Sequence, residues 1–237
     1  MGRNKYFQFK QFRIEQERSA MKVGIDGVLL GAWADVNNCK TILDIGTGTG
    51  LITLMLAQRS SSKITAIEIE KNAAQEATAN VAASEWSYRV DVKQASLQEY
   101  AAATMLKFDL IVSNPPFFQN SLKAGNDSRS IARHTDSLPF SVLIELVAHL
   151  LSENGRCAFV FPIQAYKEIE TLTPLNGLYE IRKTLVKPTE QKAANRVLVE
   201  MSKKEAVAAT DCLTIYNEDK SWTNEFKRLT HDFYLNF

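Results

Sequence analysis

The chain has 237 residues, 45% of them hydrophobic and 23% charged, and its 28 Lys and Arg nearly balance its 27 Asp and Glu. This composition is typical of a soluble globular protein that buries a core without help from metals or disulfides. No apolar run of about 18 residues and no secretory signal core is apparent, which argues against membrane-spanning and secreted proteins. The three cysteines and three histidines lack metal-ligand spacing, so we expect reduced thiols, no bound metal and a cytoplasmic location.

The predicted elements begin with an extended aromatic and basic piece, followed by a short helix over residues 25–34. From residue 40 onward, β-rich runs alternate with helical patterns. We expect strands over residues 41–45, 63–69, 88–95, 108–113 and 156–161, helices over residues 51–59, 71–84, 97–102, 138–151 and 164–172, and a turn at 153–155. This order predicts an α/β fold with a seven-stranded, mostly parallel sheet and helices on both faces. We expect one domain, in which residues 1–38 form an extension packed on a core of residues 39–237.

The later part of the chain departs from this alternation. Extended runs over residues 178–187 and 196–202 flank a polar linker and predict an antiparallel hairpin at the edge of the sheet. A last helix is expected over residues 221–234, with Ser221 as its N-cap. Residues 119–137 are polar, and we expect them to form a mobile loop.

A glycine-rich loop, Gly46-Thr47-Gly48-Thr49-Gly50, directly follows the first buried strand. Glycines let backbone N–H groups approach a ligand closely, and the helix N-terminus that follows favours anionic oxygens. A dinucleotide fingerprint would need glycine where the chain has Leu51, and the Lys-Ser/Thr pair of a P-loop is absent. The run over residues 43–50 resembles the first motif of class I methyltransferases. That resemblance implies a Rossmann-like fold and S-adenosylmethionine as cofactor, with S-adenosylhomocysteine as product.

Further cofactor contacts are expected at the ends of the first three strands. On the same resemblance, Asp44 supports the loop or reaches the amino group of the cofactor. Glu68 ends the second strand about 20 residues after the glycines, where a carboxylate can accept both ribose hydroxyl hydrogens. Glu70 is the alternative, unless it is an exposed acid at a helix N-terminus. Where the family often has an acid for the adenine amine, this chain has Ser96, so backbone groups of Ser96 and Leu97 are expected to take its place.

The motif Asn114-Pro115-Pro116-Phe117 follows the fourth strand, beside the cofactor site in this topology. An exocyclic amine on a base is a poor nucleophile because its lone pair is delocalised into the ring. Two acceptors, the Asn114 side-chain oxygen and the Pro115 carbonyl, can hold its hydrogens while the nitrogen pyramidalises. The prolines make the turn rigid, and Phe117 offers an apolar face on which the base can stack. The motif resembles that of methyltransferases acting on amino groups of adenine, guanine or glutamine.

Segments across most of the chain resemble the bacterial tRNA1(Val) adenine-37 N6-methyltransferase family. The matching segments lie at residues 21–31, 114–118, 132–134, 194–200 and 229–235. The resemblance implies methyl transfer to N6 of adenine 37 in the anticodon loop of tRNA1(Val), a base that costs little to extrude. It also implies that Lys22 lies near the cofactor. Arg133 and His134 are candidates for closing over the base or touching phosphate, and Arg196 for binding RNA or bracing an edge strand.

Two basic segments fit an RNA partner. Residues 1–22 hold six basic side chains and two acidic ones, and residues 180–204 hold seven and three. We take Lys10 and Arg13 of the first segment as candidate contacts to the phosphates of the anticodon stem-loop. Two ordinary solvated faces are the alternative. We expect a monomer, with weak dimerisation left open.

Four other functions share parts of this pattern. An rRNA guanine N2-methyltransferase has the same turn but usually carries a second, degenerate domain. A release-factor glutamine methyltransferase has a helical N-terminal domain, and a DNA adenine methyltransferase has a target-recognition domain; neither is apparent here. A non-enzymatic scaffold that binds the cofactor and assists RNA folding would have no use for two amine acceptors.

Overall fold

The computed structural model describes residues 4–116 and 138–236. Its strands are β1 (Tyr6–Gln8), β2 (Arg13–Glu15), β3 (Thr41–Ile45), β4 (Lys63–Glu68), β5 (Val90–Gln94), β6 (Phe108–Ser113), β7 (Leu151–Pro162), β8 (Tyr179–Thr189), β9 (Arg196–Ser202) and β10 (Ala209–Tyr216). Its helices are α1 (Ile25–Trp33), α2 (Leu51–Arg59), α3 (Lys71–Ala82), α4 (Leu97–Ala103), α6 (Phe140–Leu150), α7 (Ile163–Leu175) and α8 (Asn224–Thr230), with a short 3₁₀ turn, η1 (Ser87–Arg89). In the sequence, the first described range ends shortly after β6, and the second begins shortly before α6.

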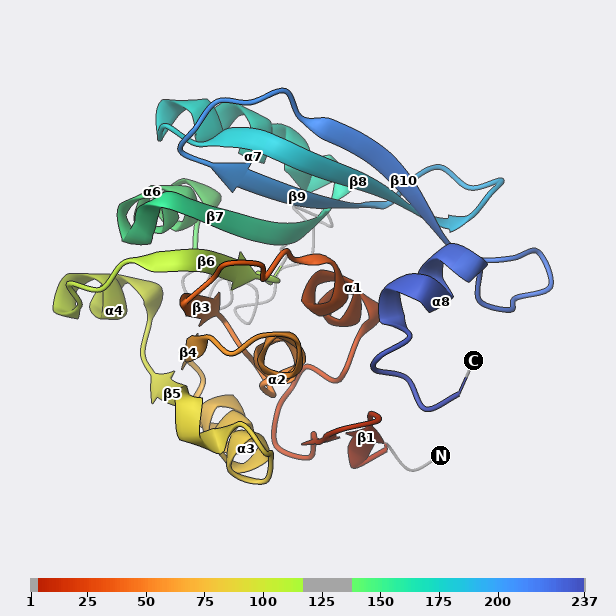
Figure 1. The fold of residues 1–237 in the computed structure, drawn as a ribbon, viewed down its shortest axis with the longest axis horizontal. Helices are drawn as coiled ribbons and strands as arrows, with labels where there is room; N and C mark the ends of the chain where they lie inside the picture. Colours follow the sequence, from red (N-terminus) through yellow and green to blue (C-terminus); the bar gives the residue numbers. More distant parts are fainter. Residues whose placement is uncertain (1–3, 117–137, 237) are drawn as a thin grey trace, which may run out of the picture.

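One large sheet organises the molecule, with strand order β10-β8-β9-β7-β6-β3-β4-β5 (Figure 1). The five strands β7, β6, β3, β4 and β5 run parallel to one another. The centre of this sheet is continuously apolar, as expected for parallel strands that helices cover on both faces. Successive residues of β3 show the two sides: Ile42 packs with α1 and α2, and Leu43 packs with the core under α4 and α6.

The α/β class and the two helical layers agree with the sequence-based expectation, but the sheet has eight strands where we expected seven. The additional strand is β10, which pairs parallel to β8 and forms the edge. Strands β8 and β9 are antiparallel as expected, yet they do not form the edge, because β10 covers the outer side of β8 while β9 pairs with β7. The first four residues of β10 are exposed, so its sequence lacks the apolar pattern that reveals a buried strand.

Two element boundaries also differ from the expectation. Residues 153–155, expected as a turn, belong to β7, and a Cβ on Gly155 would lie only 2.7 Å from the carbonyl oxygen of Phe108. Glycine is therefore needed there for close approach of β7 to β6. The last helix starts at Asn224, and its N-cap is Thr223, whose hydroxyl accepts the Phe226 N–H, rather than Ser221.

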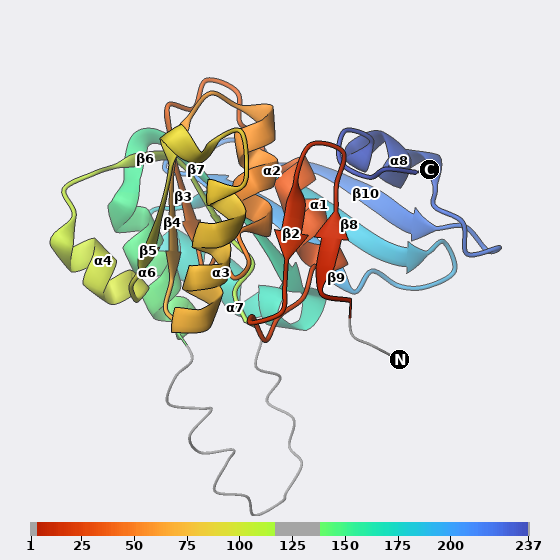
Figure 2. The same ribbon diagram turned by 90° about the horizontal axis from the view of Figure 1, so that it is seen from below.

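The N-terminal hairpin of β1 and β2 packs beside α3 (Figure 2). Phe9, Phe12 and Ile14 are buried in the same core as α1 and α2, and Phe12 meets Trp86 edge-on. In the same view, the connection from β2 to α1 reaches the side of the molecule where the parallel strands end. Within the described ranges, no helix combines the length and apolarity needed to cross a membrane.

Candidate functional site

The glycine-rich loop and the Asn-Pro-Pro turn leave neighbouring strands side by side. Ile45, the last residue of β3, is in register with Ser113, the last residue of β6. The Ser113 hydroxyl donates to the Ile45 carbonyl at 2.8 Å, which fastens the two strand ends together. Gly46 and Asn114 are the next residues of the two strands. The structure therefore brings together the two motifs that the sequence singled out.

The loop itself depends on left-handed backbone conformations. Gly46, Gly48 and Gly50 have φ values of +70°, +57° and +84°, which side-chain-bearing residues rarely adopt. A Cβ on Gly46 or Gly48 would meet no atom of the described residues within 4 Å. The surface over these two glycines is therefore open, as a cradle for a ligand requires.

Asp44 lies beneath this loop and is almost completely buried. Its Oδ2 accepts hydrogen bonds from the Thr47 and Thr53 hydroxyls, each at 2.7 Å, which ties the loop and α2 to β3. Its Oδ1 is buried without a hydrogen-bond partner among the residues that the structure places. A buried carboxylate oxygen without a donor is costly, and a donor supplied by a ligand would satisfy it.

Burial raises the pKa of Asp44 to about 6, although the Thr53 and Thr47 hydroxyls oppose the shift. Because this folded-state pKa lies above the unfolded value, the contribution of Asp44 to stability is fully present below about pH 4 and is lost as the pH rises through 6. We therefore expect the free energy of unfolding of Asp44→Asn, relative to the original protein, to rise by about 2 kcal/mol between pH 4 and pH 8. Urea unfolding of both ligand-free proteins at the two pH values measures this change. A difference in unfolding free energy between variant and original protein that stays constant or falls from pH 4 to pH 8 contradicts the prediction.

Glu68 and Glu70 have separate structural tasks. Glu68 ends β4, and its carboxylate accepts the Gly48 N–H and the Glu70 N–H, both at 2.9 Å. Glu70 is the N-cap of α3, where its two oxygens accept the Asn72 and Ala73 N–H groups. Glu68 thus contacts the glycine-rich loop, while both oxygens of Glu70 are used by the helix. This placement favours Glu68 as the ligand-binding acid.

Ser96 is the N-cap of α4 rather than a free polar group. Its hydroxyl accepts the Glu99 N–H at 3.1 Å, and its own N–H donates to the Glu99 carboxylate at 2.9 Å. This capping box uses the Ser96 backbone N–H, one of the backbone groups that we expected to be available for adenine. The Leu97 N–H, in the first turn of the helix, has no acceptor within the helix because of its position. Leu97 itself is buried against the core.

The described part of the Asn-Pro-Pro-Phe motif ends at residue 116. Asn114 is half-buried, Pro115 is buried and Pro116 is exposed, so the amide of Asn114 lies at the boundary between core and solvent. Phe117, Arg133 and His134, like the segment 119–137 that we expected to be mobile, lie outside the described residues.

The basic candidates in the N-terminal segment have local partners. Arg13 is ion-paired with Glu15 at 2.6 Å and lies 3.7 Å above the Tyr6 ring, and the Lys10 ammonium donates to the His231 carbonyl. Both side chains lie on exposed residues, so pairing does not bury them. Lys22 is half-buried in the β2–α1 connection.

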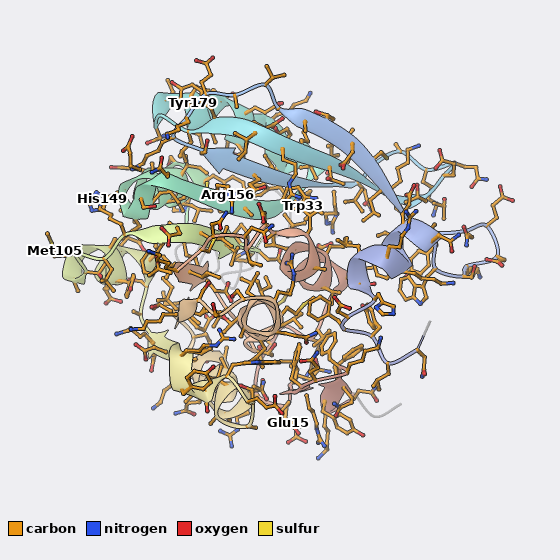
Figure 3. The ribbon with its side chains drawn as sticks, viewed as in Figure 1. Glu15, Trp33, Met105, His149, Arg156 and Tyr179 are labelled. Carbon is orange, nitrogen blue, oxygen red and sulfur yellow. The ribbon has the colours of Figure 1, made fainter. Side chains whose placement is uncertain are left out.

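Four of the seven basic side chains in residues 180–204, Arg196 among them, form ion pairs within the protein. Arg196 pairs with Asp26 at 2.9 Å and so braces β9 against the first turn of α1. Arg182 pairs with the buried Glu200 at 2.9 Å and stacks on Trp33, and Arg156 pairs with the same Glu200. Figure 3 shows Trp33 and Arg156 in this part of the molecule. The ion pair with Asp26 fits the bracing alternative for Arg196, and more than half of the basic side chains in this segment are paired inside the protein.

Two residues near the loop were not expected from the sequence. Asn80 and Glu76 of α3 are buried polar side chains that bond to the N-terminal segment, and Asn80 also bonds to the loop. Their spacing of four residues, in line with Ala73 and Ala77, places them on the buried face of the helix, and this is the signal that could have found them. Among the described residues, no group of three or more His, Cys, Asp or Glu is arranged to hold a metal ion.

Comparisons with solved structures agree with the fold. A structure titled as a predicted O-methyltransferase from Agrobacterium tumefaciens has a TM-score of 0.67 at 21% identity, covering 88% of this chain and 96% of that one. A 16S rRNA N2 methyltransferase from T. thermophilus has a TM-score of 0.56 at 19% identity, covering 84% of this chain and 50% of that one.

Sequence comparisons identify the family. A family model described as methyltransferase small domain matches residues 22–167. A protein named tRNA1(Val) (adenine(37)-N6)-methyltransferase from Trichodesmium erythraeum is 46% identical over 240 residues that cover both chains completely. A Haemophilus influenzae protein of the same name is 46% identical over 233 residues, covering 98% of this chain and 99% of the relative. With this identity over its full length, and with the loop and the Asn-Pro-Pro turn side by side, the chain belongs to the tRNA1(Val) (adenine(37)-N6)-methyltransferase family.

Proposed function

We propose that this chain transfers the methyl group of S-adenosylmethionine to N6 of adenine 37 in the anticodon loop of tRNA1(Val), acting as a single domain. The observation that carries the proposal is the position of Asn114 next to the open glycine-rich loop, fixed by the Ile45–Ser113 register. The name shared by full-length relatives supports the choice of adenine 37.

The residues around the loop fit this cofactor. Gly46 and Gly48 leave open space above a backbone that only glycine adopts easily. Asp44 offers a buried oxygen that needs a donor, and Glu68 retains lone pairs on a carboxylate at the loop's rim. When bound, S-adenosylmethionine supplies an electrophilic methyl group on a sulfonium centre.

The protein's own groups would act on the amine. The Asn114 side-chain oxygen and the Pro115 carbonyl would accept the two N–H hydrogens, which releases the nitrogen lone pair from the ring. The buried Pro115 fixes the turn, so these acceptors are positioned before substrate arrives. Once the nitrogen has been methylated it is acidic, and its extra proton can leave to water without a dedicated base.

The cradle can be tested with two matched glycines. Gly48 and Gly177 have similar φ values, +57° and +66°, and a Cβ on either meets no described atom within 4 Å. Alanine at each position therefore carries a similar backbone strain of about 1–2 kcal/mol. In Gly48→Ala we expect this strain to shift the loop and to weaken S-adenosylmethionine binding about tenfold, measured by calorimetry. A tenfold change corresponds to about 1.4 kcal/mol of binding free energy. We expect Gly177→Ala to bind normally; equal losses in the two variants would argue against ligand binding over Gly48.

The substrate assignment is tested by labelling. Purified protein with labelled S-adenosylmethionine should methylate an unmodified tRNA1(Val) transcript and should not methylate the same transcript with guanine at position 37. Label that persists after this replacement would refute adenine 37 as the target.

A further inference from the structure

Asn80 joins the glycine-rich loop to the N-terminal hairpin through a single buried side chain. Its Oδ1 accepts the Glu15 N–H, and its Nδ2 donates to the Glu15 carbonyl and to the Thr49 carbonyl, all three bonds at 2.9 Å. The residue is 2% exposed. The opposite amide orientation would place an oxygen against two carbonyl oxygens, so the contacts themselves determine the assignment of oxygen and nitrogen. Figure 3 shows Glu15 beside α3.

Thr49, which accepts the Asn80 hydrogen bond, lies where the loop meets α2 and α3. The next residue, Gly50, is in the left-handed region and is the N-cap of α2. It also lies against α3, since a Cβ on Gly50 would meet the Ala77 Cα and Cβ at 3.5 Å. The end of the loop therefore rests on α3, and the bond from Asn80 to Thr49 fixes it there.

Glu76 provides a natural comparison on the same helix face, one turn earlier. Its carboxylate accepts the Arg18 and Ser19 N–H groups, both at 2.8 Å, and it is 4% exposed. Like Asn80, it is a buried polar group that ties the N-terminal segment to α3. Its hydrogen bonds go to that segment, whereas Asn80 also bonds to the loop.

We propose that Asn80 is a positioning residue for cofactor binding, and that strand β2 thereby belongs to the support of the cofactor loop. This inference rests on the proposed function. Glu15 holds the amide of Asn80 in orientation from one side, so that its second N–H points at the Thr49 carbonyl. Loss of this donor leaves the carbonyl to find another partner, and the loop moves away from the geometry that cradles the ligand.

The test compares Asn80→Asp with Glu76→Gln. Aspartate keeps the shape of Asn80 and the acceptor for the Glu15 N–H, but it replaces the Nδ2 donor to the Glu15 and Thr49 carbonyls with an oxygen. We expect Asn80→Asp to raise the Kd and the KM for S-adenosylmethionine about tenfold, with kcat within about threefold of the original protein. Glu76→Gln disturbs the N-terminal segment and should leave both constants within about twofold. Asn80→Ala, measured in the same way, covers the case in which the aspartate variant fails to fold.

The outcomes separate the inference from the proposed function. An unchanged Kd in Asn80→Asp and Asn80→Ala overturns the positioning role, as does an equal rise in Glu76→Gln, which would trace the effect to the N-terminal segment as a whole. A loss of kcat at unchanged KM also overturns it. An original protein that binds no S-adenosylmethionine contradicts the proposed function itself.

Discussion

The Asn114→Ala variant is expected to lose methyl transfer by at least about a hundredfold, the size of effect seen when one preorganised polar contact to a reacting group is removed. Its affinity for S-adenosylmethionine should stay within about threefold, because the other groups expected to hold the cofactor, on β3, the loop, β4, α4 and the β2–α1 connection, remain in place. The reason for the loss is that one of the two acceptors of the amine hydrogens disappears and the lone pair stays delocalised. Single-turnover methylation of a tRNA1(Val) transcript and calorimetry measure the two quantities.

Ser113→Ala is the control for Asn114→Ala. It removes the buried bond between the Ser113 hydroxyl and the Ile45 carbonyl, and so disturbs the same strand end at a cost of about 1 kcal/mol in stability. It leaves both acceptors in the adjacent turn, and we expect its rate to fall by less than about tenfold. Similar rate losses in the two variants would show that the turn is needed for its shape alone. A large loss of cofactor affinity in Asn114→Ala would show that its role has been misassigned.

Glu68→Gln should weaken cofactor binding by about a hundredfold. Hydrogen bonds to a charged group contribute about 1.5–3 kcal/mol each, so losing part of a bidentate contact to the ribose hydroxyls accounts for such a change. The glutamine NH₂ group would also point at the Gly48 N–H or the Glu70 N–H, so that one of these donors loses its acceptor and the loop is held less firmly. Calorimetric titration with S-adenosylmethionine checks the prediction.

Glu70→Ala separates this effect from the other nearby acid. It removes the N-cap of α3 and should cost about 1 kcal/mol in the free energy of unfolding. Cofactor affinity should stay within about threefold of the original value. If Glu70→Ala weakened binding and Glu68→Gln did not, the two assignments would have to be exchanged.

The parts of the fold that the sequence predicts well are those with strong local patterns. The run from β3 through the loop to α2 combines a buried apolar strand with glycines at three left-handed positions. The apolar run predicts the strand, and the glycines that follow it predict the loop. The turn after β6 follows a strand that is buried at nearly every residue. Because parallel strands end at one edge, the proximity of the two motifs could also be expected before the structure was known.

Contacts between distant segments could not be predicted in this way. Composition made residues 180–204 a basic segment, but charge counts do not reveal that Arg182 shares the buried Glu200 with Arg156, or that Arg196 finds Asp26. The same limit applies to Ser96, whose use in a capping box depends on Glu99 and on where α4 begins. Pairing within the protein, rather than residue type, decides which charges remain available to an RNA.

The most direct measurement for the central claim is mass spectrometry of nuclease-digested tRNA from a strain lacking this gene, with and without a plasmid that restores it. We predict that the anticodon-loop fragment of tRNA1(Val) lacks one methyl group in the deletion strain and regains it, at N6 of adenine 37, with the plasmid. The plasmid encoding Asn114→Ala should not restore the methyl group. A fragment that is already methylated in the deletion strain, or that the original gene leaves unmethylated, would contradict the proposed function.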